Sequence, residues 1–167
     1  METQATATEQ QLFISTEAML RHWQGHRNLT RRVIEAFPED QLFSFSVGGM
    51  RPFAQLAMEI IDIAVPGVKG LADGKWEKVE SFDHSLGSIK TKQQLLELWD
   101  ETTKVIDEYW PQISEERFQQ VEVAFGMYEN ANYATFLYFL DNEIHHRAQG
   151  YVYLRALGIE PPFFWER

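Results

Sequence analysis

The chain contains no cysteine among its 167 residues. This absence excludes disulfide bonds, zinc–thiolate centres, iron–sulfur clusters and a catalytic thiol supplied by the protein itself. Any metal ion would have to bind His, Asp, Glu or amide side chains.

Long apolar runs and a basic N-terminal region are also missing. The longest uncharged, mostly apolar run spans only Ala134 to Leu140, far short of the ~20 residues that cross a bilayer. The first residues, METQATATEQQ, contain neither a basic segment nor an apolar one. We therefore expect no secretory signal, no membrane association and a cytoplasmic location.

Positive charge is scarce. The 15 Lys and Arg residues are outnumbered by 25 Asp and Glu residues, which gives a formal net charge of -10. The densest basic cluster is Arg27, Arg31 and Arg32, and Glu35 and Glu39 follow it closely. An acidic chain of this kind repels phosphate backbones, so we expect no nucleic-acid partner.

Apolar residues, by contrast, are abundant. Hydrophobic residues make up 44% of the chain and aromatic residues 14%, which is typical of a folded domain with a sizeable core. The length fits one domain over residues 1–167, with residues 1–10 expected to be flexible.

Two helices are predicted in the N-terminal half. Residues 16–37 place apolar side chains at steps of three and four, with Thr16 as the expected N-cap and Pro38 at the end. A second helix begins near Arg51–Pro52 and runs to Pro66–Gly67, where the proline predicts a kink or a stop.

Two more helices are predicted in the C-terminal half. Thr91 and Gln94 form a capping-box pattern at the start of the third, which Pro111 closes. The fourth covers residues 132–157, and Gly158 just beyond it is typical of a C-terminal cap.

Two long connections separate these helices. Residues 71–90 are too long for a tight bundle loop and are a candidate wall of a site. Residues 111–130 contain VEVAFGM, whose alternation predicts a short strand or an extended crossover. The fold class predicted is all-α, a four-helix bundle with long connections, in preference to a globin-like or mixed α+β fold.

The last helix carries a motif shared with a known family. The segment from Asp141 to Pro162 contains His-Arg-Ala-Gln at 146–149 and Tyr-Leu-Arg-Ala-Leu-Gly at 153–158. These residues, together with Pro52 to Ile60 in the second helix, resemble the DinB/YfiT-like family of four-helix-bundle proteins. The resemblance covers nearly the whole chain and supports the predicted fold.

The resemblance implies a metal site at three positions, Glu59, Asn142 and His146. The family has histidine at all three, whereas this chain keeps only His146. Glu and His are good ligands for a divalent first-row metal such as Zn, Ni or Mn, and an Asn carbonyl is a weaker one. The resemblance also implies a homodimer, in which part of the aromatic set of the fourth helix and of the tail PPFFWER would lie at the interface.

The function that the resemblance implies is metal-dependent transfer with a low-molecular-weight thiol such as bacillithiol or mycothiol. Arg147 and Gln149 would shape the catalytic site, and the missing cysteine suits a nucleophile that comes from the cosubstrate. The alternative is a non-catalytic, stress-related binding module whose metal site has degenerated, because two of the three histidines are replaced.

Several neighbouring residues leave the ligand set open. Glu143 is an alternative to Asn142, and Asp141 with His145 forms a rival pair whose simpler interpretation is a solvent-exposed one. His22 and His26 have a metal-ligand spacing, but we expect a structural role for both. His26 is also a candidate to donate a hydrogen bond to a metal ligand, since it could line the same cavity as Glu59 and His146. His84 is interpreted as a surface loop residue. Glu59 needs a partner in any case, and Arg147 and His146 are the candidates.

Overall fold

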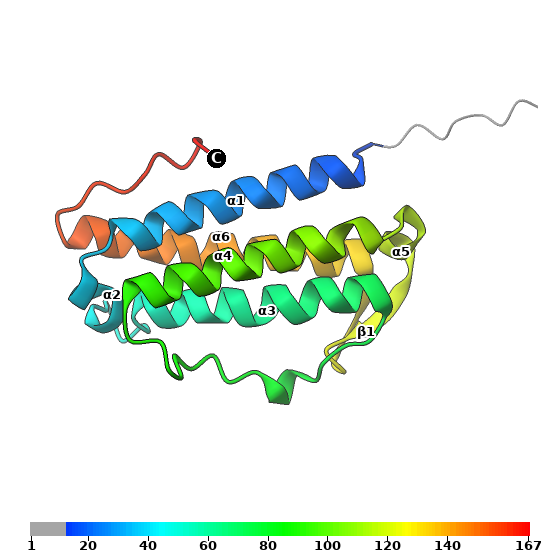
Figure 1. Ribbon diagram of the computed structural model, residues 1–167, viewed down its shortest axis with the longest axis horizontal. Helices are drawn as coiled ribbons and strands as arrows, with labels where there is room; N and C mark the ends of the chain where they lie inside the picture. The colour runs from blue at the N-terminus through cyan, green and yellow to red at the C-terminus, as the bar shows by residue number, and fades with distance from the viewer. Residues whose placement is uncertain (1–12) are drawn as a thin grey trace, which may run out of the picture.

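Four long helices form most of the structure, a computed structural model that describes residues 13–167 (Figure 1). They are α1 (Thr16–Ala36), α3 (Phe53–Asp73), α4 (Lys92–Tyr109) and α6 (Asn132–Ala156). The predicted flexible segment 1–10 lies outside the described residues. Within residues 13–167, none of the helices combines the length and hydropathy needed to cross a membrane. The predicted all-α four-helix bundle is confirmed.

Each long helix packs against two others. Helices α1 and α3 both contact α4 and α6, so α1 and α3 occupy opposite corners of the bundle. Helix α3 runs antiparallel to α6, because Gly67 lies against Phe139 and Gly150 lies against Phe53. A Cβ atom at Gly150 would be 2.5 Å from the Phe53 ring. This glycine therefore permits the close approach of α3 and α6 that the candidate site depends on.

The helix ends largely follow the predicted signals. The Thr91 hydroxyl accepts a hydrogen bond from the Gln94 N–H, and the Gln94 side-chain oxygen accepts one from the Thr91 N–H, so the capping box is confirmed. Gly158 has a φ of 76°, and the Ile159 N–H bonds the Leu154 carbonyl at 2.8 Å, as in a Schellman cap. The prediction for α1 was wrong by one residue, because Ser15 rather than Thr16 caps it by accepting from Ala18 N–H.

Helix α3 does not stop at Pro66, so of the predicted kink or stop the stop is wrong. It continues to Asp73, and Gly74 then ends it with a φ of 73°. The residues around and beyond the proline, Ala64, Val68 and Leu71, are buried. Burying side chains as large as Val and Leu contributes about 1.5–3 kcal/mol each, which offsets the roughly 3 kcal/mol that an interior proline costs. Leu71 therefore belongs to the core and not to the connection.

The connections contain short elements that periodicity did not predict. They are the helices α2 (Glu39–Ser44) and α5 (Glu115–Gln119) and the 3-10 turns η1 (Val79–Ser81) and η2 (Trp110–Gln112). The VEVAFGM segment forms a strand, β1 (Val121–Ala124), which pairs antiparallel with β2 (Tyr128–Ala131). Val121 pairs with Ala131 and Ala124 with Tyr128. The turn uses positive φ at Phe125 and Gly126.

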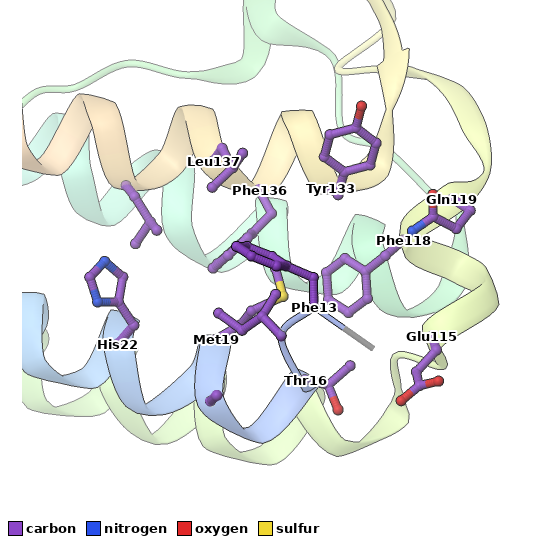
Figure 2. Close-up of a pocket in the computed structure, with 13 residues that line it drawn as sticks. Phe13, Thr16, Met19, His22, Glu115, Phe118, Gln119, Tyr133, Phe136 and Leu137 are labelled. Atoms are coloured by element: carbon purple, nitrogen blue, oxygen red, sulfur yellow. The ribbon is translucent and has the colours of Figure 1, made fainter. Parts of the chain in front are cut away.

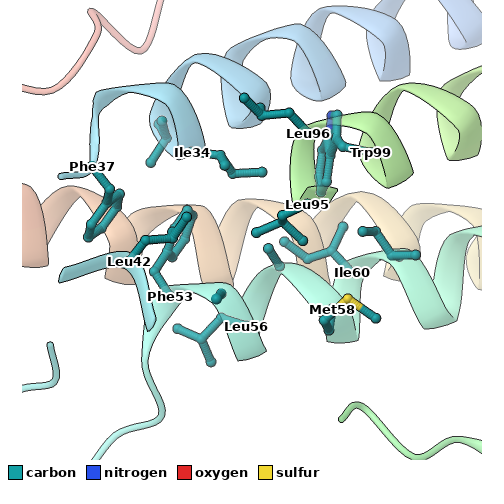
Figure 3. Packing of buried hydrophobic residues seen from close by; sticks show 14 of the residues in the cluster. Ile34, Phe37, Leu42, Phe53, Leu56, Met58, Ile60, Leu95, Leu96 and Trp99 are labelled. Carbon is teal, nitrogen blue, oxygen red and sulfur yellow. The ribbon is translucent and has the colours of Figure 1, made fainter. Parts of the chain in front are cut away.

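The core has two apolar halves. One is rich in aromatic rings, among them Trp23, Trp110, Phe118 and Phe136, two of which border the hollow in Figure 2. The other, around Phe37, Phe53 and Trp99, fills the opposite end of the bundle (Figure 3).

Polar side chains occupy the middle, between the two apolar halves along α1 and α6. They are Arg27, Thr30, Glu143 and Arg147, all buried. Arg27 lies 3.5 Å from the centre of the Trp99 ring. Helix α6 therefore carries two charged residues, Glu143 and Arg147, inside the core.

Candidate functional site

Glu59 of α3 and His146 of α6 meet where these two helices pack. Glu59 Oε1 lies 3.0 Å from His146 Nε2. His146 is buried and Glu59 is half-buried. Two of the three positions that the sequence singled out for a metal are therefore in direct contact, across the interface of the two helices.

The bond made by His146 Nδ1 determines whether Nε2 can donate to Glu59. His146 Nδ1 lies 2.7 Å from Gln149 Oε1, and the Gln149 amide nitrogen donates to Met50 Sδ at 3.3 Å. Because the Gln149 oxygen faces the ring, Nδ1 is the donor of that bond. In the neutral tautomer, Nε2 then presents a lone pair to the Glu59 oxygen. Two acceptors 3.0 Å apart need a positive charge between them, either a proton or a metal ion.

Asn142 completes the predicted trio from one turn earlier on α6. Its amide nitrogen donates to Glu59 Oε1 at 3.3 Å. Its carbonyl oxygen is buried and has no hydrogen-bond partner within the described part of the chain. A buried amide oxygen without a partner is costly. Since rotation of the amide exchanges its oxygen and nitrogen, this side chain can offer an oxygen ligand at the same spot.

Arg51 is a member of the site that sequence reasoning missed. Its guanidinium donates to Glu59 Oε2 and forms an ion pair with it. Burial by itself raises the pKa of Glu59, but the hydrogen bond from Arg51, and after it a positive charge on His146 when that ring is protonated, outweigh burial and lower the pKa to about 2. The carboxylate is therefore ionised at neutral pH, with one oxygen on Arg51 and the other facing His146.

Arg147 and Gln149, the two residues expected to shape the site, lie on different faces of α6. Gln149 orients His146, as described above. Arg147 instead points toward α1, where it donates to Thr30 Oγ1 at 3.1 Å and to His26 Nδ1 at 3.0 Å. Its ion pair is with Glu143 at 3.8 Å. The structure thus brings Gln149, but not Arg147, to the Glu59–His146 pair.

The alternative ligands are also separate from this pair. Glu143 is fully buried, accepts from Thr30 Oγ1 at 2.6 Å, and has its pKa raised by burial. Asp141 and His145 are exposed, as in their simpler interpretation. His26 is buried and bound to Arg147.

His84 departs from the surface role that we expected. It is half-buried, and Asp62 of α3 accepts from both its backbone N–H and its ring Nδ1, each at 3.0 Å. This contact holds the connection between α3 and α4 against α3.

The donors present fit a weakly held divalent ion. Residues 13–167 contain no group of three His, Cys, Asp or Glu side chains placed to hold a metal. What Glu59, His146 and Asn142 offer is one carboxylate, one imidazole and one amide. Such a mixed nitrogen and oxygen set suits a divalent first-row ion. The contact of His146 Nε2 with Glu59 Oε1, both acceptors when the ring is neutral, favours an ion here. Rotation of the Asn142 amide would turn its partnerless oxygen toward the same carboxylate.

Two solved structures of DinB-like proteins have the same fold as this chain. A DinB-like protein from Bacillus cereus, 15% identical, superposes with a TM-score of 0.70 over 88% of this chain and 95% of that chain. A DinB-like protein from Bacillus subtilis, 20% identical, gives a TM-score of 0.68 over 89% and 99%. No curated protein matches the chain. The DinB family model matches residues 1–166. The chain therefore belongs to the DinB family.

Proposed function

We propose that this protein is a metal-dependent transferase that acts with a low-molecular-weight thiol at the Glu59–His146 pair. The observation that carries the proposal is the 3.0 Å contact between His146 Nε2 and Glu59 Oε1, in which both atoms are acceptors when the ring is neutral. The bond from His146 Nδ1 to Gln149 is the outer contact that metal-binding histidines commonly make.

Glu59, Asn142 and His146 would hold the ion. A divalent ion bound there would lower the pKa of a thiol that coordinates it, so that the thiol acts as a thiolate at neutral pH. Because the chain has no cysteine, the sulfur nucleophile has to come from the cosubstrate. In the transfer, the sulfur forms a bond to an electrophilic carbon, the leaving group departs with its bonding electrons, and the thiol proton passes to solvent.

The surrounding residues have separate roles in this proposal. Gln149 keeps the His146 ring in one tautomer and orientation. Arg51 holds the Glu59 carboxylate, and its own side chain is 43% exposed. An ion that neutralised Glu59 would leave the positive charge of Arg51 without that partner. That charge would attract an anionic group on the thiol cosubstrate.

The direct test is elemental analysis of tag-free protein after loading with Zn²⁺, Ni²⁺ or Mn²⁺. We expect about one ion per chain in the wild type, and loss of that ion in Glu59→Gln and His146→Ala. His145→Ala is the matched control, because it removes the exposed neighbouring histidine and should leave the metal content unchanged. Metal retained in both site variants would rule out this ligand set.

A second function, a non-catalytic binding module, is favoured by one specific contact. The ion pair with Arg51 already neutralises Glu59 without a metal. If loading leaves the wild type free of metal, and the loaded protein does not accelerate the reaction of a small thiol with an aryl halide, the module is the better description. Arg51→Met would then be the informative variant. If the Arg51 ion pair is what keeps an ion from Glu59, removing it should raise the metal affinity.

A further inference from the structure

A second feature lies on the opposite side of α6 from the Glu59–His146 pair. It is a hollow of about 770 Å³ between the start of α1, α5 and the first half of α6. Its walls are mainly apolar and include Met19, Phe118, Phe136 and Leu137. In Figure 2, His22 lies at one end of this hollow and Glu115 with Gln119 at the other. The volume and the apolar walls are those of small-molecule sites in proteins.

The His22 end of the hollow adjoins a cluster of nitrogen donors. His22 Nε2 is 3.2 Å from His26 Nε2, which is also 3.1 Å from Arg167 Nη1. His26 Nδ1 is in turn 3.0 Å from Arg147 Nη2. Arg167 comes from the C-terminal tail, which folds back over α1 so that its Cβ lies 3.1 Å from the Cβ position of Gly25.

The two arginines and His22 make three contacts with the His26 ring, which has only one acceptor nitrogen for them. A neutral imidazole has one acceptor nitrogen and one N–H. Burial, and after it the charge of Arg147, lower the pKa of His26 to about 3, so the ring is neutral at pH 7. When His26 Nδ1 accepts from Arg147, Nε2 carries the proton and donates to His22. The Arg167 guanidinium then faces an N–H and not a lone pair.

The two arginines also differ in their ion pairs. Arg147 is paired with Glu143. Within residues 13–167, no carboxylate lies within 4.0 Å of the Arg167 guanidinium. The hollow ends at the exposed His22. The Arg167 guanidinium lies just beyond, on the same His26 nitrogen that His22 contacts. An apolar hollow with these two groups at one end is complementary to a molecule with an apolar body and one anionic oxygen group.

We propose that the hollow binds an apolar monocarboxylate, with its carboxylate at His22 and Arg167 and its hydrocarbon part along Met19, Phe136 and Leu137. The carboxylate supplies the acceptor that Arg167 lacks. Glu115 at the far end repels the opposite orientation. This site is independent of the proposed thiol chemistry, because none of its residues contacts Glu59 or His146.

The test compares two probes by isothermal titration calorimetry on the full chain, both below their aggregation concentrations. We expect dodecanoate to bind, and dodecanol, which has the same chain and no charge, to bind at least about tenfold more weakly. Arg167→Met should weaken dodecanoate about tenfold and leave dodecanol unchanged. Arg155→Met is the matched control, since Arg155 is exposed on α6 outside the hollow, and it should change neither. Leu137→Glu places a charge in the hollow and should remove both.

Three outcomes would overturn the proposal. Equal affinity for dodecanoate and dodecanol would mean that the charged end contributes nothing. Unchanged dodecanoate binding in Arg167→Met would mean that the carboxylate lies elsewhere. No dodecanoate binding to a wild type that light scattering shows to be a dimer, with Leu137→Glu monomeric, would mean that a second copy covers the hollow. Circular dichroism of each variant checks that it is folded.

Discussion

Helix α6 carries two polar pairs that are offset by one residue and face different partners. Asn142 and His146 turn toward Glu59 on α3, whereas Glu143 and Arg147 turn toward Thr30 and His26 on α1. One residue corresponds to a rotation of about 100° around a helix. We call Glu59, Asn142, His146, Gln149 and Arg51 the site cluster, and Thr30, Glu143, Arg147 and His26 the core cluster.

The two clusters differ mainly in access to water. The Glu143 and Arg147 side chains are 1% and 7% exposed, whereas those of Glu59 and Arg51 are 17% and 43% exposed. A buried charge needs a partner side chain within the folded protein, whereas a charge that water reaches can also bind a ligand. We therefore expect the core cluster to determine stability and the site cluster to determine ligand binding.

The largest predicted effect tests the core cluster. Arg147→Ala removes the ion-pair partner of the buried Glu143 and leaves Arg27 as a nearby cation. We expect the free energy of unfolding to fall by up to about 3–5 kcal/mol in urea denaturation. Arg155→Ala, an exposed arginine on the same helix, should change it by less than about 0.5 kcal/mol. The double variant Glu143→Leu/Arg147→Met removes both charges and should recover much of the loss. A single-variant effect as small as that of Arg155→Ala would contradict the division between the clusters.

The next effect tests how the site cluster is assembled. Gly150→Ala brings a methyl group to 2.5 Å from the Phe53 ring, so either this buried ring or the spacing of α3 and α6 has to change. We expect a loss of about 1–3 kcal/mol in stability and a weaker contact between Glu59 and His146, seen as reduced metal content. Phe53→Leu in the same chain should restore both, because it makes room for the methyl group. Reduced stability with unchanged metal content would show that the site tolerates a wider helix spacing.

Much of the fold was predictable from local patterns. The capping box at Thr91 and the glycine cap at Gly158 depend on neighbouring residues only, so the sequence predicted them correctly. Pro66 misled because its cost is local, whereas the burial of Val68 and Leu71 that offsets it depends on distant helices. Short elements such as α2 and α5 contain too few turns for a periodic signal.

The candidate site was predictable in part. The trio Glu59, Asn142 and His146 came from the family resemblance, and the structure brings these three side chains together. The orientation of Arg147 could not be read from spacing, since apolar side chains occur on several faces of α6 and do not indicate which face meets α3. Arg51 was missed because it precedes α3, and only its long side chain brings it back to Glu59. No spacing rule within a helix describes such a contact.

The smallest effect concerns pH and the Glu59–Arg51 ion pair. The pKa of Glu59 lies at about 2 in the folded protein against an ordinary value of 4.5. A carboxyl whose pKa is lowered by folding contributes stability that is fully present above its ordinary pKa and is lost as the pH falls toward its folded pKa. Because Arg51 is 43% exposed, solvent screens the pair, and we expect its contribution to be about 1 kcal/mol at most.

Glu59→Gln should therefore lower the free energy of unfolding slightly at pH 7 and by progressively less as the pH falls from 4.5 through 2, and the two proteins should converge below pH 2. Urea denaturation at a series of pH values measures this difference directly. Arg31, whose pair with Asp100 lies on the surface between α1 and α4, offers a control: Arg31→Met should leave the pH profile of Glu59→Gln unchanged when the two are combined. A difference that persists unchanged at pH 2 would mean that Glu59 acts through packing and not through its charge, and the contrast with the core cluster would then fail.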